Sequence, residues 1–172
     1  MGLINRLLGR SGEPPADVYL GLRSQAMKAR PDDLELMPDP AAPIHGVLME
    51  TGASGSVATF LVLADGTVSL YLSTGGGVIG AGEHEEVRAA AAEMLALTNK
   101  YATAYIEACA ATTDSPLPQD GQVFFYLLTT SGLYLARCKE ADLENRNDPF
   151  TNLFENCHAV LGELREATER TR

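Results

Sequence analysis

Apolar and polar residues alternate near the middle of the chain in a way that predicts β-strands. Apolar side chains occupy every second position of residues 67–73, which is the period of a half-buried strand. An apolar run at residues 57–64 precedes this stretch, and Asp65-Gly66 separates the two. Asp-Gly between two β-rich runs favours a type I′ hairpin turn, in which both central residues have positive φ. Together with a short apolar run at residues 44–50, the pattern predicts a three-stranded meander.

Two later stretches carry the period of a helix. Apolar residues recur at spacings of four and three through residues 83–111, which predicts one long amphipathic helix. Its wide apolar arc takes in Leu95, Ala102 and Ile106. A last helix is predicted to begin at Asp148-Pro149 and to end near residue 168, because Asp is a good N-cap and Pro needs no hydrogen bond in the first turn.

A second hairpin is predicted between the two long helices, from residues 123–129 and 133–138. Its elements repeat those of the first half at a constant offset of 66 residues. The offset pairs Val57 with Val123, Gly66 with Gly132, Val68 with Tyr134, Val87 with Leu153 and Leu95 with Leu161. This regularity has two explanations, an internal duplication or a shared order of elements.

These elements predict an α+β fold with an antiparallel sheet of about five strands and helices packed on it. The expected order is helix, three-strand meander, long helix, hairpin and helix. Residues 1–12 form a predicted tail, and residues 13–43 a short helix followed by a proline-rich arm. A single core domain is predicted for residues 44–172.

Charge narrows the classes of partner. The formal net charge is −10, and residues 44–172 carry nearly all of it, with eight basic and seventeen acidic side chains. An acidic surface repels phosphate backbones and anionic headgroups, so we expect neither nucleic acid nor membrane as a partner. The three cysteines show no disulfide or zinc spacing, and no signal peptide or membrane span is evident, so a cytoplasmic protein is expected.

The glycine-rich stretch at residues 73–84 is the main candidate for chemistry. Its glycines satisfy G-x-G-x-x-G between a strand and a helix, where a phosphate-binding loop would lie. Three glutamates at the start of the helix already match its positive dipole end, and no Lys-Ser or Lys-Thr follows the glycines. The small-ligand site remains the alternative interpretation, and its candidate residues are Gly75, Gly76, Gly77, Gly80, Gly82 and His84.

No catalytic set emerges from the sequence. The histidines lack metal-ligand spacing, and no G-x-S-x-G motif is present. Cys157 and His158 are adjacent on a predicted helix, so their side chains point about 100° apart and make a poor catalytic pair. We therefore expect a protein that is not an enzyme and that holds no metal or cofactor.

The order of elements over residues 17–168 resembles the type III secretion chaperone-like fold. The proline-rich arm and the glycine-rich stretch depart from that pattern, and profilin-like and roadblock-like sheets are nearly as compatible. The resemblance implies a small, acidic, mostly dimeric protein that binds polypeptides without chemistry. We therefore expect a chaperone-like interaction domain that forms a homodimer through its wide apolar arc and binds another protein.

Overall fold

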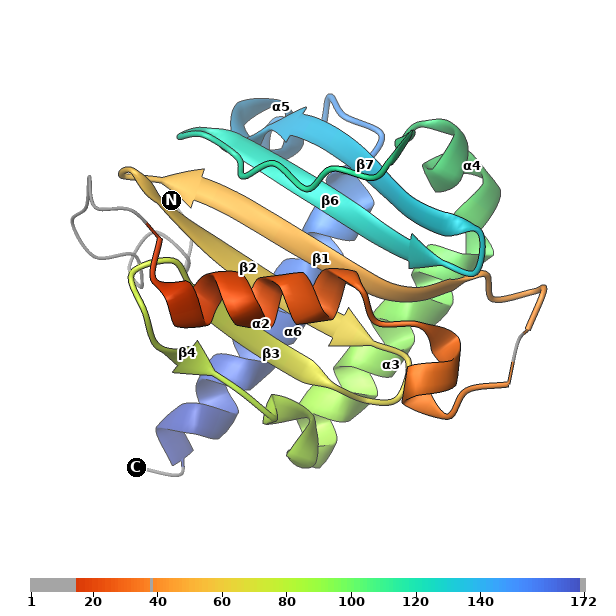
Figure 1. Cartoon of the computed structure of the whole chain (residues 1–172), viewed down its shortest axis with the longest axis horizontal. Helices are drawn as coiled ribbons and strands as arrows, with labels where there is room; N and C mark the ends of the chain where they lie inside the picture. The colour runs from red at the N-terminus through yellow and green to blue at the C-terminus, as the bar shows by residue number, and fades with distance from the viewer. Residues whose placement is uncertain (1–14, 38, 171–172) are drawn as a thin grey trace.

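The computed structural model describes residues 15–37 and 39–170, so the tail predicted at residues 1–12 lies outside the described residues. The seven strands form a single sheet in the order β4-β3-β2-β1-β6-β7-β5, with every neighbouring pair antiparallel (Figure 1). Their bounds are β1 (Ile44–Ala53), β2 (Ser56–Leu63), β3 (Val68–Leu72), β4 (Gly77–Val78), β5 (Ala110–Thr112), β6 (Gln122–Thr129) and β7 (Gly132–Lys139). The predicted α+β class is confirmed.

The sheet has seven strands rather than about five. The two additional strands, β4 and β5, are its outermost members and are only two and three residues long. A strand that short has no measurable period of apolar residues, so the pattern could not reveal it.

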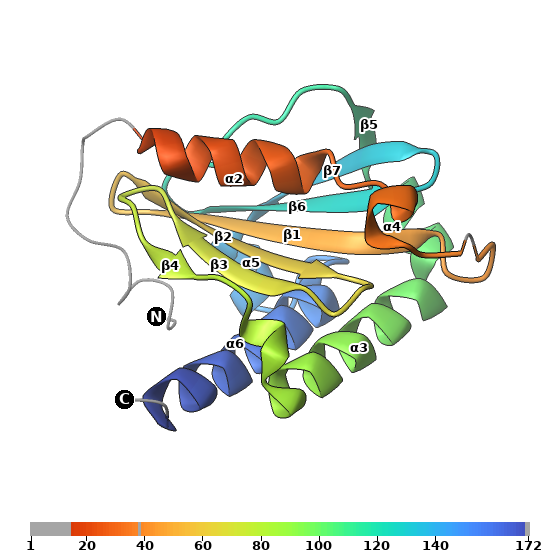
Figure 2. The ribbon, with the colours of Figure 1, turned by 60° about the horizontal axis from the view of Figure 1, so that its bottom comes forward.

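Helices lie on both faces of the sheet (Figure 2). On one face, α3 (Glu85–Lys100) and α6 (Thr151–Arg170) pack against each other and against a large apolar core. On the other face, α2 (Asp17–Met27) crosses the sheet by itself and covers a second apolar cluster. The remaining helices are short: η1 (Pro31–Leu34), η2 (Ala81–Glu83), α4 (Ala102–Glu107) and α5 (Glu140–Glu144).

The prediction of one helix over residues 83–111 is wrong. Helix α3 ends at Lys100, and Tyr101 has φ −115° and ψ 22°, outside the helical region. Just before this break, Asn99 turns its amide toward β1. Its Nδ2 donates to the Ile44 carbonyl at 2.9 Å and its Oδ1 accepts from the Ile44 N–H at 3.0 Å. The chain resumes as α4 and then pairs with β7 as strand β5.

The type I′ turn predicted at Asp65-Gly66 is also wrong. Only Gly66 has positive φ there, at 92°, and the Asp65 side chain instead accepts a hydrogen bond from the Thr67 N–H at 2.8 Å. The turn between β1 and β2 does place two successive residues in the left-handed region, Ser54 at φ 54° and Gly55 at φ 71°. The Asp65 carboxylate thus stabilises its turn by an Asx-type hydrogen bond.

The offset of 66 residues is a shared order of elements and not a structural repeat. Strands β2 and β6 flank β1 on opposite sides, and both run antiparallel to it. Phe60 faces α3 and α6, whereas Tyr126 faces α2. In the second strands, Leu70 and Ala136 face the same side. At a constant offset of 66 residues, no single superposition can therefore match both strands of one hairpin to the other.

The last helix begins slightly later than predicted. Asp148 still caps this turn, since its Oδ1 accepts a hydrogen bond from the Phe150 N–H at 2.8 Å. The helical residues follow from Thr151 and continue to Arg170. The segment between the second hairpin and this cap is not irregular, because it contains α5.

Candidate functional site

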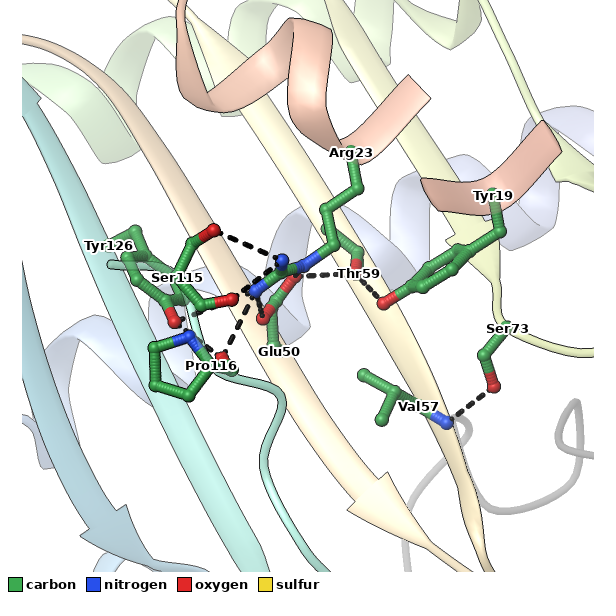
Figure 3. A network of polar contacts seen from close by, with 9 residues as sticks. All are labelled: Tyr19, Arg23, Glu50, Val57, Thr59, Ser73, Ser115, Pro116 and Tyr126. Carbon is green, nitrogen blue, oxygen red and sulfur yellow. Dashed lines mark hydrogen bonds and ion pairs between the residues drawn. The ribbon is translucent and has the colours of Figure 1, made fainter. Parts of the chain in front are cut away.

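Helix α2 meets the sheet through polar side chains. Its buried residues are Tyr19, Arg23 and Ala26, which follow the spacing of one helical face. Two of the three carry hydrogen-bonding groups, so the helix is held by directional contacts in addition to apolar packing. Figure 3 shows these contacts as one connected network beneath the helix.

The centre of the network is a buried ion pair between Arg23 and Glu50 of β1. The Nε atom donates to Oε1 at 2.6 Å and Nη2 donates to Oε2 at 2.8 Å. Both side chains are buried, with Glu50 fully inaccessible. The guanidinium also donates to the carbonyls of Ser115 and Pro116, at 2.9 and 3.1 Å. Arg23 therefore joins α2, β1 and the loop before β6.

Hydroxyl groups complete the network on both sides. Tyr19 donates to the Thr59 hydroxyl at 2.8 Å, and Thr59 donates in turn to Glu50 Oε1 at 2.8 Å. On the other side, the Tyr126 hydroxyl donates to the Pro116 carbonyl at 2.6 Å. Every oxygen of Glu50 thus receives at least one donor, which a buried carboxylate requires.

Burial and charge keep the two tyrosines neutral and Arg23 charged. Burial raises the pKa of Tyr126 to about 12, and the charge of Glu50 acts in the same direction. Burial also raises the pKa of Tyr19. Burial by itself would lower the pKa of Arg23, but the hydrogen bond and charge of Glu50 outweigh this and raise it. These contacts position α2, and none of them leaves a group free to attack or to accept a proton.

The glycine-rich stretch lies around β4, and packing explains two of its candidate ligand residues. A Cβ on Gly77 would lie 2.0 Å from the Leu70 carbonyl oxygen, and a Cβ on Gly82 would lie 1.9 Å from the Gly66 oxygen. Gly75, Gly76 and Gly80 have positive φ values of 92°, 83° and 74° and no contact within 4 Å of an added Cβ. The ligand site assigned to this loop stays a prediction.

The remaining candidate, His84, is half-buried and stands at the N-cap of α3 without a side-chain capping bond. Of the other histidines, His45 is buried near the end of α2 and His158 packs edge-on against Phe154, with ring centroids 4.4 Å apart. Burial lowers the pKa of His158. The structure does not bring these three side chains together, and no metal-holding group of His, Cys, Asp or Glu is found among the described residues.

Cys138 and Cys157 are buried, and Cys109 is partly buried. Burial raises the pKa of the Cys109 thiol to about 12 and also raises the pKa values of Cys138 and Cys157. Cys157 is fully buried, with its Sγ 3.6 Å from Met94 Sδ, and therefore points away from the half-buried His158. A raised pKa leaves little thiolate at neutral pH, which makes these thiols poor nucleophiles.

An apolar depression lies between the first turns of α2 and strand β4. All of its lining residues are apolar, aromatic or glycine: Val18, Tyr19, Leu22, Tyr71, Leu72, Gly76, Gly77 and Ile79. Its volume is about 160 Å³. Val18 is 61% exposed and Ile79 is 67% exposed, so two aliphatic side chains stand in solvent at its rim. We call these eight residues the β4 depression.

Reasoning from the sequence missed both the ion pair and the depression. Glu50 interrupts an apolar run, and Arg23 lies among apolar neighbours, which together were the available signal. Comparison with protein-family models, curated proteins and solved structures finds no match. Among the described residues, no helix has the length and apolar content needed to cross a membrane.

Proposed function

We propose that this chain is a non-enzymatic, chaperone-like binding protein that receives an extended polypeptide at the β4 depression. The observation that carries the proposal is the pair of exposed aliphatic side chains, Val18 and Ile79, beside the edge strand β4. An edge strand can pair with an added strand through its backbone. An apolar side chain of the added strand could then enter the depression.

Charge and the order of elements support the same class of function. The net charge of −10 favours a peptide that carries Lys or Arg beside its apolar residues. Over residues 17–168 the longer elements follow the order helix, three-strand meander, helix, hairpin and helix. This is the order that resembles the type III secretion chaperone-like fold. Positive φ at Gly75 and Gly76 turns the chain sharply from β3 to β4. In this proposal the glycines shape the edge and do not bind phosphate.

The homodimer stays a prediction, but the wide apolar arc over residues 83–111 no longer supports it. That arc is largely covered within the chain, because Leu95 is 7% exposed and Ala102 is 6% exposed. On the outer side of α3 and the following turn, Leu97 and Tyr101 are 39% and 53% exposed. Light scattering at micromolar concentration, with Tyr101→Glu as the variant, tests for self-association through this surface.

The peptide site is tested by selecting binders from a displayed peptide library with the full chain. We expect selected peptides to carry alternating aliphatic residues and basic neighbours, and to bind about tenfold or more weakly to Ile79→Glu. Met37→Glu is the matched control, since Met37 is 88% exposed but lies on the arm. Selected peptides that bind equally to wild type and Ile79→Glu would contradict the proposal.

The small-ligand alternative at residues 75–82 is tested by a separate experiment. Thermal unfolding of the full chain is measured with nucleotides, inorganic phosphate and divalent metal ions, since a ligand that binds only the native state raises the melting temperature. A rise that Gly80→Ala removes would favour the glycine-rich stretch as a ligand site. The same melting temperature with and without these probes would favour the peptide site.

A further inference from the structure

A cleft of about 670 Å³ lies at the C-terminal end of α2. Residues 27–32 line it on the α2 side, residues 128–133 line it from the β6–β7 hairpin, and His45 also lines it. Its volume falls within the range of about 300–1,000 Å³ that is usual for small-molecule sites. The cleft shares no lining residue with the β4 depression, so it is a separate feature.

His45 lines this cleft with an unsatisfied nitrogen. The side chain is 6% exposed, and its Nε2 lies 2.9 Å from the Ala29 carbonyl oxygen. A carbonyl only accepts, so Nε2 carries the proton of this bond, and in the neutral ring Nδ1 is the acceptor. Protein atoms cover Nδ1, yet no described residue supplies it with a hydrogen-bond partner. Buried polar atoms nearly always have a partner, so His45 is a wall residue whose hydrogen bonding the described residues leave incomplete.

A bulge in β1 accounts for the placement of this ring. Ile44 pairs with Thr129 and Gly46 pairs with Leu128, so His45 is the additional residue between two successive pairs. A bulge of this kind re-aims one side chain out of the regular alternation and is common beside binding sites. Here it places His45 against the end of α2.

Two cations face the same cleft without an acidic partner. Lys28 and Arg30 line it, and neither forms an ion pair with any described residue. Elsewhere, Arg23, Arg146, Arg165 and Arg170 each pair with a glutamate, whereas Arg88, Lys100, Arg137 and Lys139 form no ion pair with a described residue. One carboxylate, Asp32, also lines the cleft. The charged side chains that line the cleft therefore sum to +1 in a chain of net charge −10, which makes the cleft locally more favourable for negative charge than the chain as a whole.

We propose that this cleft binds a small organic oxyanion, a phosphate monoester or a carboxylate attached to an apolar body. Lys28 and Arg30 contact the oxyanion, and the hydroxyls of Thr130 and Ser131 lie in the opposite wall. Met27, Leu128 and Leu133 supply the apolar surface for the body of the ligand.

The test uses the full chain with phenyl phosphate and benzoate, which join the two oxyanions to the same apolar ring. Binding is measured by calorimetry and located by ¹⁵N NMR. We expect the imidazole nitrogens of His45 and the amides of Thr130 and Ser131 to shift on titration. Tighter binding of phenyl phosphate would identify a phosphate ligand, and tighter binding of benzoate a carboxylate ligand.

Surface variants then separate the cleft from general charge. Lys28→Gln with Arg30→Gln should weaken binding by about tenfold or more. Lys139→Gln with Arg165→Gln removes the same charge outside the cleft and should leave binding unchanged. Equal weakening in the two double variants would overturn the proposal, as would the absence of amide shifts at Thr130 and Ser131 at about 10 mM probe. Shifts confined to residues 75–82 would overturn it too, by moving the anion site to the glycine-rich stretch.

Discussion

Arg23 on α2 and Glu50 on β1 form a bidentate ion pair beneath the helix, with N–O distances of 2.6 and 2.8 Å. The same guanidinium holds the loop at Ser115 and Pro116 through their carbonyl oxygens. One side chain therefore ties three segments that are far apart in the sequence. Helix α2 covers its face of the sheet without a neighbouring helix, so its attachment depends strongly on this pair (Figures 2 and 3).

Arg23→Met should destabilise the chain by about 3–5 kcal/mol, because it leaves the carboxylate of Glu50 buried without a countercharge. The free energy of unfolding is measured in urea by two spectroscopic probes. The double variant Arg23→Met/Glu50→Leu should lose clearly less free energy of unfolding than the sum of the two single variants. The reason is that two apolar side chains replace the ion pair and leave no buried charge without a partner. Additive losses would show that the two side chains do not interact as described.

Hydrogen exchange should locate the effect of Arg23→Met. We expect amides of α2 to exchange faster than in wild type, while amides of α3 and α6 keep their protection, because those helices share the other core.

Gly21→Ala should stabilise α2, in contrast to Arg23→Met. Gly21 is exposed inside α2 and an added Cβ meets nothing within 4 Å, so this variant should stabilise the chain by about 0.5–1 kcal/mol. A lower melting temperature for Gly21→Ala would contradict the helix as described.

Two glycine variants distinguish close packing from backbone conformation. Gly82→Ala should cost about 3 kcal/mol, because its Cβ would lie 1.9 Å from the Gly66 carbonyl oxygen. Gly75→Ala should cost about 1 kcal/mol, because its φ of 92° is unfavourable for alanine while the space is open. Thermal unfolding compares the two variants. The reverse order would mean that η2 does not pack on the β2–β3 turn.

Alkaline pH should destabilise the chain through its buried tyrosines. The pKa of Tyr126 is raised to about 12 by burial, whereas an unfolded tyrosine ionises near pH 10. The native state therefore holds more protons in this interval, and the free energy of unfolding falls as pH rises from about 10 through 12. Urea unfolding at several pH values measures the slope. Tyr126→Phe should make that slope shallower, and an unchanged slope would contradict the assignment.

A buried hydroxyl offers a stabilising substitution. Thr51 on β1 is 2% exposed, and its Oγ1 finds no hydrogen-bond partner among the described residues. Thr51→Val keeps the shape of the side chain and removes the unpaired group, so we expect a gain of about 1 kcal/mol or more. Thermal unfolding provides the measurement, and Thr59→Val is the contrast. Thr59 bridges Tyr19 and Glu50, so its replacement should be destabilising.

The spacing of apolar residues was sufficient to predict that the long helices and strands exist and which faces they bury. Val87, Ala91, Met94 and Thr98 share one predicted helical stripe, and all four are buried in the structure. Tyr101 belongs to the same predicted stripe but is 53% exposed, because α3 has already ended at Lys100. The local pattern is continuous at this point. Asn99 bonding to β1 and the pairing of β5 with β7 decide where the helix stops, and neither partner is near in the sequence.

The candidate sites depended almost wholly on long-range contacts. The glycine-rich stretch was visible as a turn, but its neighbours across the β4 depression come from α2, more than fifty residues earlier. Likewise, His45 was visible as a residue at the start of a strand. The bulge and the end of α2 place it in a cleft with Lys28 and Arg30.

Local patterns were enough to establish the α+β class, the five longer strands, the helical faces and the acidic charge. Each of these depends on spacing or composition within one segment. The tertiary structure decided the short edge strands, the end of α3, the side of the sheet that α2 covers and the pairing of Arg23 with Glu50. Those features depend on which distant segments meet, because a two-residue strand or a single buried charge has no period and gains its stability only from its partner.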